Sequence, residues 1–304
     1  MTRRHRTGQP AAGPRAEPPE RQLYGRTSTP ATAGARRTGV GMRRLIIALL
    51  VLAGLLVAAD FGSAALAESA VSRQMRSQLD LADDPAVRIN GFPFLTQAVA
   101  GRYSSVNVDA SRIEVGQLQE LSVTAQLRDV DAPLSMLLGS GEKTLRVREV
   151  EGTVRVPAKD VERLVPGVQD LRIETLDGDA LEQIAEDAED PALAGLDPER
   201  TVRLVGTSAL LGEEAEVAVV AALELVDGQV RISPRNIELG GENAPEIPAS
   251  AQRTLTQLFT VRIDPGALPL RATPTDLRAV NGNLEISGTA ADLVLGAGSP
   301  LTAR

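Results

Sequence analysis

The sequence predicts an α+β domain built on a long, curved antiparallel sheet wrapped on helices, after an N-terminal membrane helix. Apolar and polar residues alternate along several stretches after residue 86, which is typical of strands buried on one face. Two glycine turns, Asp227-Gly228 and Asn281-Gly282, join such stretches as β-hairpins. An uncharged run of fifteen residues, 45–59, precedes all of them. We therefore expect one β-rich domain beyond a single apolar helix.

Charge is distributed unevenly along the chain. Residues 1–44 contain ten Arg, no Lys and two Glu, whereas the remainder contains 22 basic and 38 acidic residues. We predict that residues 1–42 form a disordered, Arg-rich cytoplasmic tail, because they are rich in Arg, Pro and Gly and lack apolar periodicity. The acidic remainder argues against nucleic acid as a partner, because it repels phosphate.

The apolar run continues into a longer helix. Fifteen helical residues rise only about 22 Å, less than the ~30 Å of a hydrocarbon core, so a full span must extend through Asp60 to Ala67. Ala65-Leu66-Ala67 also has the small-residue spacing of a signal-peptidase site. Residues 43–67 are therefore a signal peptide or a membrane anchor, and both alternatives stay open. In either case the Arg cluster predicts that residues 68 onward lie outside the cytoplasm.

Periodicity also predicts the elements of the domain. The helix is expected to continue over 64–82 and to end at Asp83-Asp84-Pro85. A domain of residues 68–298 follows, with a C-terminal tail at 299–304. The expected strands include 121–128, 150–156, 217–225, 230–232 and 284–286, and the expected helices are 157–165, 179–189 and 248–258.

Composition excludes several kinds of chemistry. The chain has no Cys, and its one His is His5 in the predicted tail. The domain therefore lacks a thiolate nucleophile, a Ser-His-Asp triad and any Cys- or His-ligated metal. Residues 139–144 lack the spacing of a phosphate loop, and the acidic residues 177–190 lack that of a calcium loop, so we interpret them as a hairpin turn and a solvated helix face. We expect no catalytic residue, metal or cofactor.

The most unusual segment runs from Asn90 to Tyr103. It holds three of the four aromatic residues of the predicted domain, and it reads as a strand, a Gly-Phe-Pro turn, a short helix and a second strand. These aromatic residues either plug the core or line an apolar entrance to a lipid-binding groove. Pro93 stiffens the turn, and in an extended stretch Phe92 and Phe94 would share one face. We expect Phe92 to be structural and Phe94 to reach the groove.

Several motifs follow one another in a fixed order. A signal-like helix leads into Gly-Phe-Pro-Phe-Leu-Thr at 91–96 and Gly-Arg-Tyr-Ser-Ser-Val-Asn-Val at 101–108. Leu-Pro-Leu at 268–270, Pro-Thr-Asp-Leu at 274–277 and Gly-Asn-Leu-Glu-Ile-Ser-Gly-Thr-Ala at 282–290 come near the C-terminus. With these motifs, residues 43–297 resemble the LmeA-type family of actinobacterial envelope phospholipid-binding proteins.

The resemblance implies a cell-envelope protein on the periplasmic side of the inner membrane, either membrane-anchored or secreted. Such a protein binds phospholipid, for example phosphatidylinositol, carries or presents it, and supports maturation of mannose-bearing glycolipids. The resemblance also implies a sheet similar to tubular lipid-binding folds. We expect a monomer that is not an enzyme, with Phe92, Pro93, Phe94, Leu95 and Tyr103 as lipid-binding residues.

Two other functions remain open. One is a lipid-free adaptor that stabilises a membrane glycosyltransferase or another envelope partner. The other is a lipid hydrolase, which the absence of Cys and of any His in the domain disfavours.

Overall fold

The structure is a computed structural model that describes residues 38–133, 144–208, 214–226, 229–239, 247, 249–263 and 273–296. The chain divides into two compact units, Met1–Val51 and Leu52–Arg304. Helix α1 (Thr38–Leu79) begins in the first unit, within the range predicted to be a disordered tail. Residues 1–37, the predicted tail at 299–304 and the predicted turns at 139–143 and 227–228 lie outside the described residues. All contacts below belong to the second unit.

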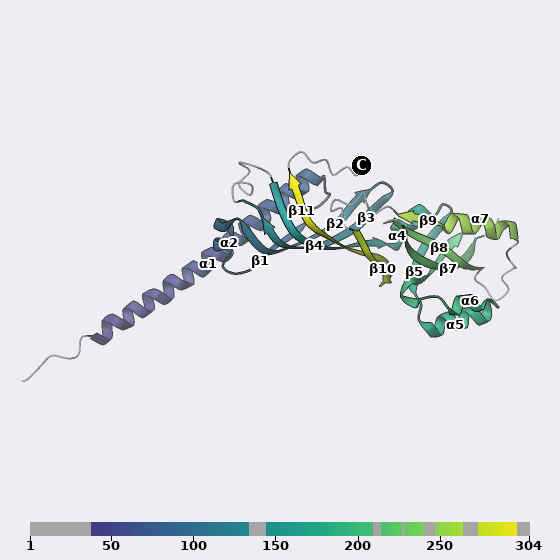
Figure 1. Cartoon of the computed structure of the whole chain (residues 1–304), viewed down its shortest axis with the longest axis horizontal. Helices are drawn as coiled ribbons and strands as arrows, with labels where there is room; N and C mark the ends of the chain where they lie inside the picture. Colours follow the sequence, from purple (N-terminus) through teal and green to yellow (C-terminus); the bar gives the residue numbers. More distant parts are fainter. Residues whose placement is uncertain are drawn as a thin grey trace, which may run out of the picture. The chain divides into compact units, whose positions relative to one another are not determined.

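The first sheet has six antiparallel strands in the order β1-β2-β3-β4-β11-β10 (Figure 1). Along β3 the residues predicted to alternate do so, with Leu121, Val123, Ala125 and Leu127 buried. The strands are β1 (Ala86–Asn90), β2 (Arg102–Val115), β3 (Leu118–Asp131), β4 (Thr144–Pro157), β10 (Thr273–Val280) and β11 (Asn283–Gly296).

The second sheet has five antiparallel strands in the order β5-β6-β7-β8-β9. Its middle strand, β7, is buried on both faces from Val217 to Leu223. The strands are β5 (Val168–Thr175), β6 (Thr201–Ser208), β7 (Ala215–Val226), β8 (Gln229–Leu239) and β9 (Val261–Ile263). The helices near them are α4 (Ala158–Leu164), α5 (Gly178–Asp187), α6 (Pro191–Ala194), the 3-10 helix η1 (Pro198–Arg200) and α7 (Ala249–Phe259).

These elements confirm the predicted α+β class with curled antiparallel strands, and they divide the strands between two sheets. The division begins at Pro157. This residue ends β4 and occupies the N-cap position of α4 with extended backbone angles (φ −70° and ψ 156°). The predicted helices at 157–165, 179–189 and 248–258 correspond to α4, α5 and α7. The Asn281-Gly282 hairpin is also confirmed, since both residues have the positive φ (50° and 76°) that a type I′ turn requires.

Two separate apolar clusters form the core. The central cluster joins the two sheets and includes Val123, Val154 and Ile286 of the first sheet. The Tyr103 cluster lies at the other end of the first sheet, and it consists of Phe94, Ala98, Tyr103, Ala125, Leu127, Val130, Ala132, Val147 and Val150. Ala64 and Ala67 of α1 pack against it. The first sheet therefore buries one face along its length, with a different cluster at each end.

The buried carboxylate of Asp160 fixes the start of β3 against α4. Its two oxygens accept hydrogen bonds from the backbone N–H groups of Gln119 (3.0 Å) and Glu120 (2.8 Å). Arg163, one helical turn further along, forms an ion pair with the same carboxylate. A buried charge is tolerated only when its hydrogen bonds are satisfied, and this one is satisfied by neighbouring backbone.

Candidate functional site

Glycine residues lie on both sides of the short helix α2 (Phe94–Ala100), where the backbone angles require them. Gly91 follows β1 with φ 110°, and a Cβ atom there would lie 2.6 Å from Nε2 of Gln97 and 2.9 Å from Oγ of Ser104. Gly101 ends α2 with φ 65°, and its N–H donates to the carbonyl of Ala98 (3.2 Å). The Gly-Phe-Pro-Phe segment is thus a sharp strand-to-helix turn.

The start of α2 is capped by a residue from another helix. Pro93 occupies the N-cap position and supplies no side-chain hydrogen bond to the first N–H groups of α2. Asp60 of α1 supplies two instead: its carboxylate oxygens accept the N–H groups of Phe94 and Leu95, each at 2.8 Å. The carboxylate is buried, and its negative charge lies at the positive end of the short helix. Asp60 therefore connects α1 to the turn.

Further contacts continue along α1. The Glu68 carboxylate accepts the backbone N–H of Ile89 in β1 (2.7 Å). The Ser72 hydroxyl donates to the carbonyl of Pro85 (2.6 Å). Residues 60–72 of α1 are consequently part of the domain, on both sides of the candidate cleavage position after Ala67.

The two Phe rings of the turn lie in opposite environments, and Phe92, which was expected to be structural, is the exposed one. Phe94 is 4% exposed and contacts the buried Tyr103 (ring centroids 6.2 Å apart), whereas Phe92 is 64% exposed. Phe92 stacks on Phe61 of α1, with ring centroids 6.1 Å apart and planes 26° apart. The prediction assumed one extended stretch, but the chain turns at Gly91 and α2 begins at Phe94. The two side chains therefore do not share a face.

The other predicted residues divide in the same way. Tyr103 belongs to the buried cluster, whereas Pro93 and Leu95 are exposed beside Phe92. Contact of any of the five with lipid stays a prediction. Sequence reasoning missed Asp60 and Phe61, and the available signal was a lone carboxylate next to an aromatic residue in an otherwise uncharged segment.

The Tyr103 hydroxyl is a polar atom with no hydrogen-bond partner among the described residues. Tyr103 belongs to an apolar cluster, and burial raises the pKa of Tyr103 above its ordinary value. A buried hydroxyl without a partner costs about 1–3 kcal/mol, which a hydrogen bond to a ligand or a water molecule would offset.

A row of small residues lies on the side of the Tyr103 cluster that faces the central cluster. Ala125 of β3 pairs with Gly152 of β4, and Gly152 pairs with Gly288 of β11. Directly paired residues point to the same face of a sheet, and Ala125 is buried in the Tyr103 cluster. The buried face of the first sheet thus lacks large side chains along this row.

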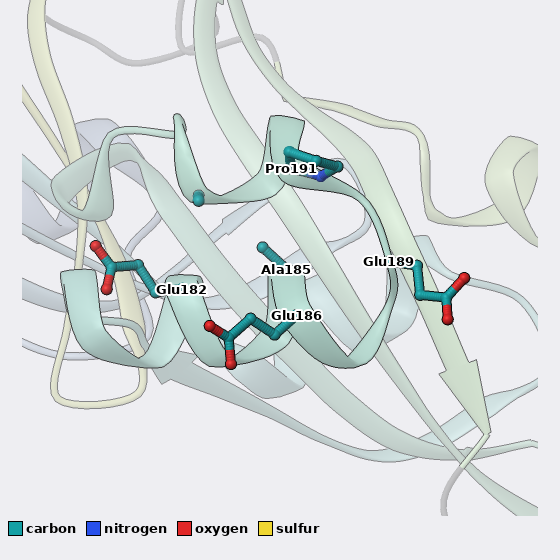
Figure 2. Close-up of a pocket in the computed structure, with 6 residues that line it drawn as sticks. Glu182, Ala185, Glu186, Glu189 and Pro191 are labelled. Atoms are coloured by element: carbon teal, nitrogen blue, oxygen red, sulfur yellow. The ribbon is translucent and has the colours of Figure 1, made fainter.

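A hollow of about 450 Å³ beside α5 and α6 has a different character. Glu182, Glu186 and Glu189 line it together with Ala185, Pro191 and Ala194, and Figure 2 shows the carboxylate of Glu189 well apart from the other two. Glu182 and Glu186 are exposed, as predicted for a solvated helix face. Electrostatic repulsion from these three carboxylates disfavours binding of a phosphate headgroup in the hollow.

Within the described ranges, no group of three His or acidic side chains could hold a metal ion.

Helix α1 is long and apolar enough from Gly41 to Leu79 to cross a membrane, judged by length and composition. Its apolar residues before Asp60 are exposed, including Leu52, Leu55 and Leu56. This agrees with a membrane anchor or a signal sequence.

The comparison with protein families covers most of the second unit. A family model described as LmeA-like phospholipid-binding matches residues 58–289, which is more than half of the chain. No similar sequence was found among curated proteins. The match begins two residues before Asp60, and it includes the turn at Phe92–Leu95, the second sheet, the first sheet up to residue 289 of β11, and the buried residues of both apolar clusters. The chain therefore belongs to the LmeA-like phospholipid-binding family.

Proposed function

We propose that this protein holds a phospholipid against the buried face of its first sheet and carries or presents it outside the cytoplasm, without a covalent step. The observation that carries the proposal is the family match over residues 58–289. Phosphatidylinositol as cargo, a role in glycolipid maturation and action as a monomer are finer parts of the proposal, and they rest on the resemblance that the motifs at 91–96 and 101–108 carry.

The acyl chains would lie along the row formed by Ala125, Gly152 and Gly288. Aliphatic side chains border this row on both sides, and acyl chains need only apolar area without directional contacts. Burial of each methylene group contributes about 0.8 kcal/mol, so a short stretch of chain is enough for firm binding. The Tyr103 hydroxyl, which has no partner among the described residues, would donate to an oxygen of the lipid ester or phosphate.

Helix α1 would remain attached to the domain as a membrane anchor. Cleavage after Ala67 would remove Asp60, which binds the N–H groups of Phe94 and Leu95. It would also remove Phe61 from Phe92 and Ala64 from the Tyr103 cluster. The contacts of residues 60–67 thus support an anchored protein, and the Arg-rich flank supports a domain on the periplasmic side of the inner membrane.

Photo-crosslinking tests lipid binding in the full-length chain. A phospholipid with a diazirine in its acyl chain, carrying either an inositol or an ethanolamine headgroup, should label peptides of β3, β4 and β11 after reconstitution. Labelling of residues 45–59 reports lipid that merely surrounds the apolar helix and serves as the internal control. Labels confined to residues 45–59 would contradict the proposal and favour the lipid-free adaptor.

A matched pair of variants sharpens this experiment. Ala125→Leu fills the row of small residues, and Ala221→Leu adds the same volume to the central cluster in the second sheet. Each overpacking is expected to cost about 1–3 kcal/mol of stability. Only Ala125→Leu should also abolish labelling of the first sheet. An equal loss in both variants would show that labelling follows stability rather than space.

Tyr103→Phe should separate the role of the hydroxyl from that of the ring. Without lipid, the variant should be as stable as the parent or more stable by up to about 3 kcal/mol, because an unpaired buried hydroxyl is removed. Because burial raises the pKa of Tyr103 above 10.0, the parent should lose stability as the pH rises through 10, and the variant should lack this loss. Lipid labelling should fall. Unchanged labelling together with lower stability would mean that the hydroxyl has a structural partner.

Asp60→Asn tests the connection between α1 and the turn. The amide offers one acceptor oxygen where the carboxylate offers two, so the variant should lose about 1–3 kcal/mol of stability. Hydrogen exchange of the Phe94 and Leu95 amides should accelerate. Asp109→Asn, an exposed position on β2, is the matched control and should change neither quantity. Unchanged exchange at Phe94 in Asp60→Asn would rule out the proposed cap.

Intact-mass measurement tests retention of α1. The protein purified from host membranes should contain residues 60–67, because these residues complete the domain. A mature chain that begins at Glu68 would contradict the anchor.

A further inference from the structure

An exposed apolar surface surrounds the turn that Asp60 holds. It consists of Phe61 of α1, Phe92 of the turn, and Leu95 and Val99 of α2. Phe61 and Phe92 stack on each other although both are 64% exposed. Leu95 and Val99 are four residues apart on one face of α2, next to the face that carries the buried Phe94 and Ala98, and Val99 is 83% exposed. We call these four residues the aromatic patch.

The patch is uncharged as well as apolar. Residues 61–67 and 91–101 contain no Asp, Glu, Lys or Arg. The charge of Asp60 lies between these two segments, but its carboxylate is buried and bonded to two N–H groups. Scattered apolar side chains are common on protein surfaces, whereas adjacent ones without intervening charge mark a contact surface.

The apolar surface continues from the patch onto α1. Leu52, Leu55 and Leu56 belong to the same unit, are exposed, and precede Phe61 by one to three helical turns. In the proposed anchor these leucines face lipid. The patch therefore begins where the membrane-embedded part of α1 ends, and exposed apolar side chains at that level sit at the boundary of headgroups and acyl chains.

We propose that the aromatic patch inserts into the outer leaflet of the bilayer that α1 enters. This inference rests on the proposed function of α1 as an anchor. Contact with the leaflet would keep the Tyr103 cluster, which α2 covers with Phe94 and Ala98, next to the lipid supply. The protein would thus contact the membrane at two places, through the membrane-spanning part of α1 and through the aromatic patch beside it.

The absence of cysteine in the parent chain allows single-site labelling of the full-length protein. Val99→Cys carries an environment-sensitive fluorophore on the patch. Glu186→Cys on the exposed face of α5 is the solvent control, and Leu55→Cys in the apolar run is the membrane control. Each labelled protein is reconstituted into vesicles of phosphatidylcholine and phosphatidylglycerol, with or without phospholipid that carries a nitroxide near the headgroup.

The label at position 99 should shift to shorter wavelength in vesicles, lose most of its fluorescence to the nitroxide lipid and resist aqueous iodide. The label at position 186 should do none of these. Adding Phe92→Ser to Val99→Cys should restore access of iodide to the label. Phe92 is exposed, so this change should leave the fold intact, which circular dichroism checks.

Two outcomes would overturn the proposal in distinguishable ways. If the label at 99 stays open to iodide while the label at 55 is protected, α1 is anchored and the patch does not touch the bilayer. If both labels stay open, the anchor itself fails. Protection of position 99 in dilute detergent, without quenching by nitroxide lipid in vesicles, would assign the patch to a protein partner or a second copy and would also overturn the proposal.

Discussion

The two hydrogen bonds from Phe94 and Leu95 to the carboxylate of Asp60 are the contact on which the site depends. A seven-residue helix is far below the length at which helices are stable by themselves, and α2 begins at a proline position that supplies no cap. The buried carboxylate satisfies both orphan N–H groups at once. With α2 in place, Phe94 closes over Tyr103 and Phe92 meets Phe61. One side chain thus determines which aromatic ring is buried and which is exposed.

Asp160 repeats the same arrangement where the first sheet meets the second. Each of these buried carboxylates accepts the N–H groups of two successive residues at the start of an element, about 35 residues away for Asp60 and about 40 for Asp160. Hydrogen bonds to charged groups are roughly twice as strong as those between neutral groups. The two ends of the first sheet are therefore held by polar contacts, while the space between them is aliphatic and includes the row of small residues. This separation leaves apolar area where an acyl chain could bind without disturbing either end.

Local pattern predicted most elements of this fold, because alternation along β3 and β11 reflects burial of one face. It was wrong about the burial of β7, which was predicted to be buried on one face and is buried on both from Val217 to Leu223. It did not predict two sheets, since β4 and β11 pair across more than a hundred residues and no local period encodes that pairing. The turn at 91–96 was recognised from its residue types, but the burial of Phe92 and Phe94 depended on where α2 begins. The role of Asp60 was missed for the same reason: in the sequence it is only a costly charge beside an apolar run, and its partners lie far along the chain.

The Asp60 contact also has a consequence for biogenesis. In a protein anchored through α1, residue 60 leaves the translocation channel before Phe94 and Leu95 do, so its carboxylate has no backbone partners until the next part of the chain follows. In such an anchored protein, capping of α2 would require that α1 stops at a depth that leaves Asp60 outside the hydrocarbon. A helix halted too deep would hold the carboxylate in lipid and leave α2 unformed. Folding of the domain would thus depend on the insertion depth of α1 through the carboxylate of Asp60.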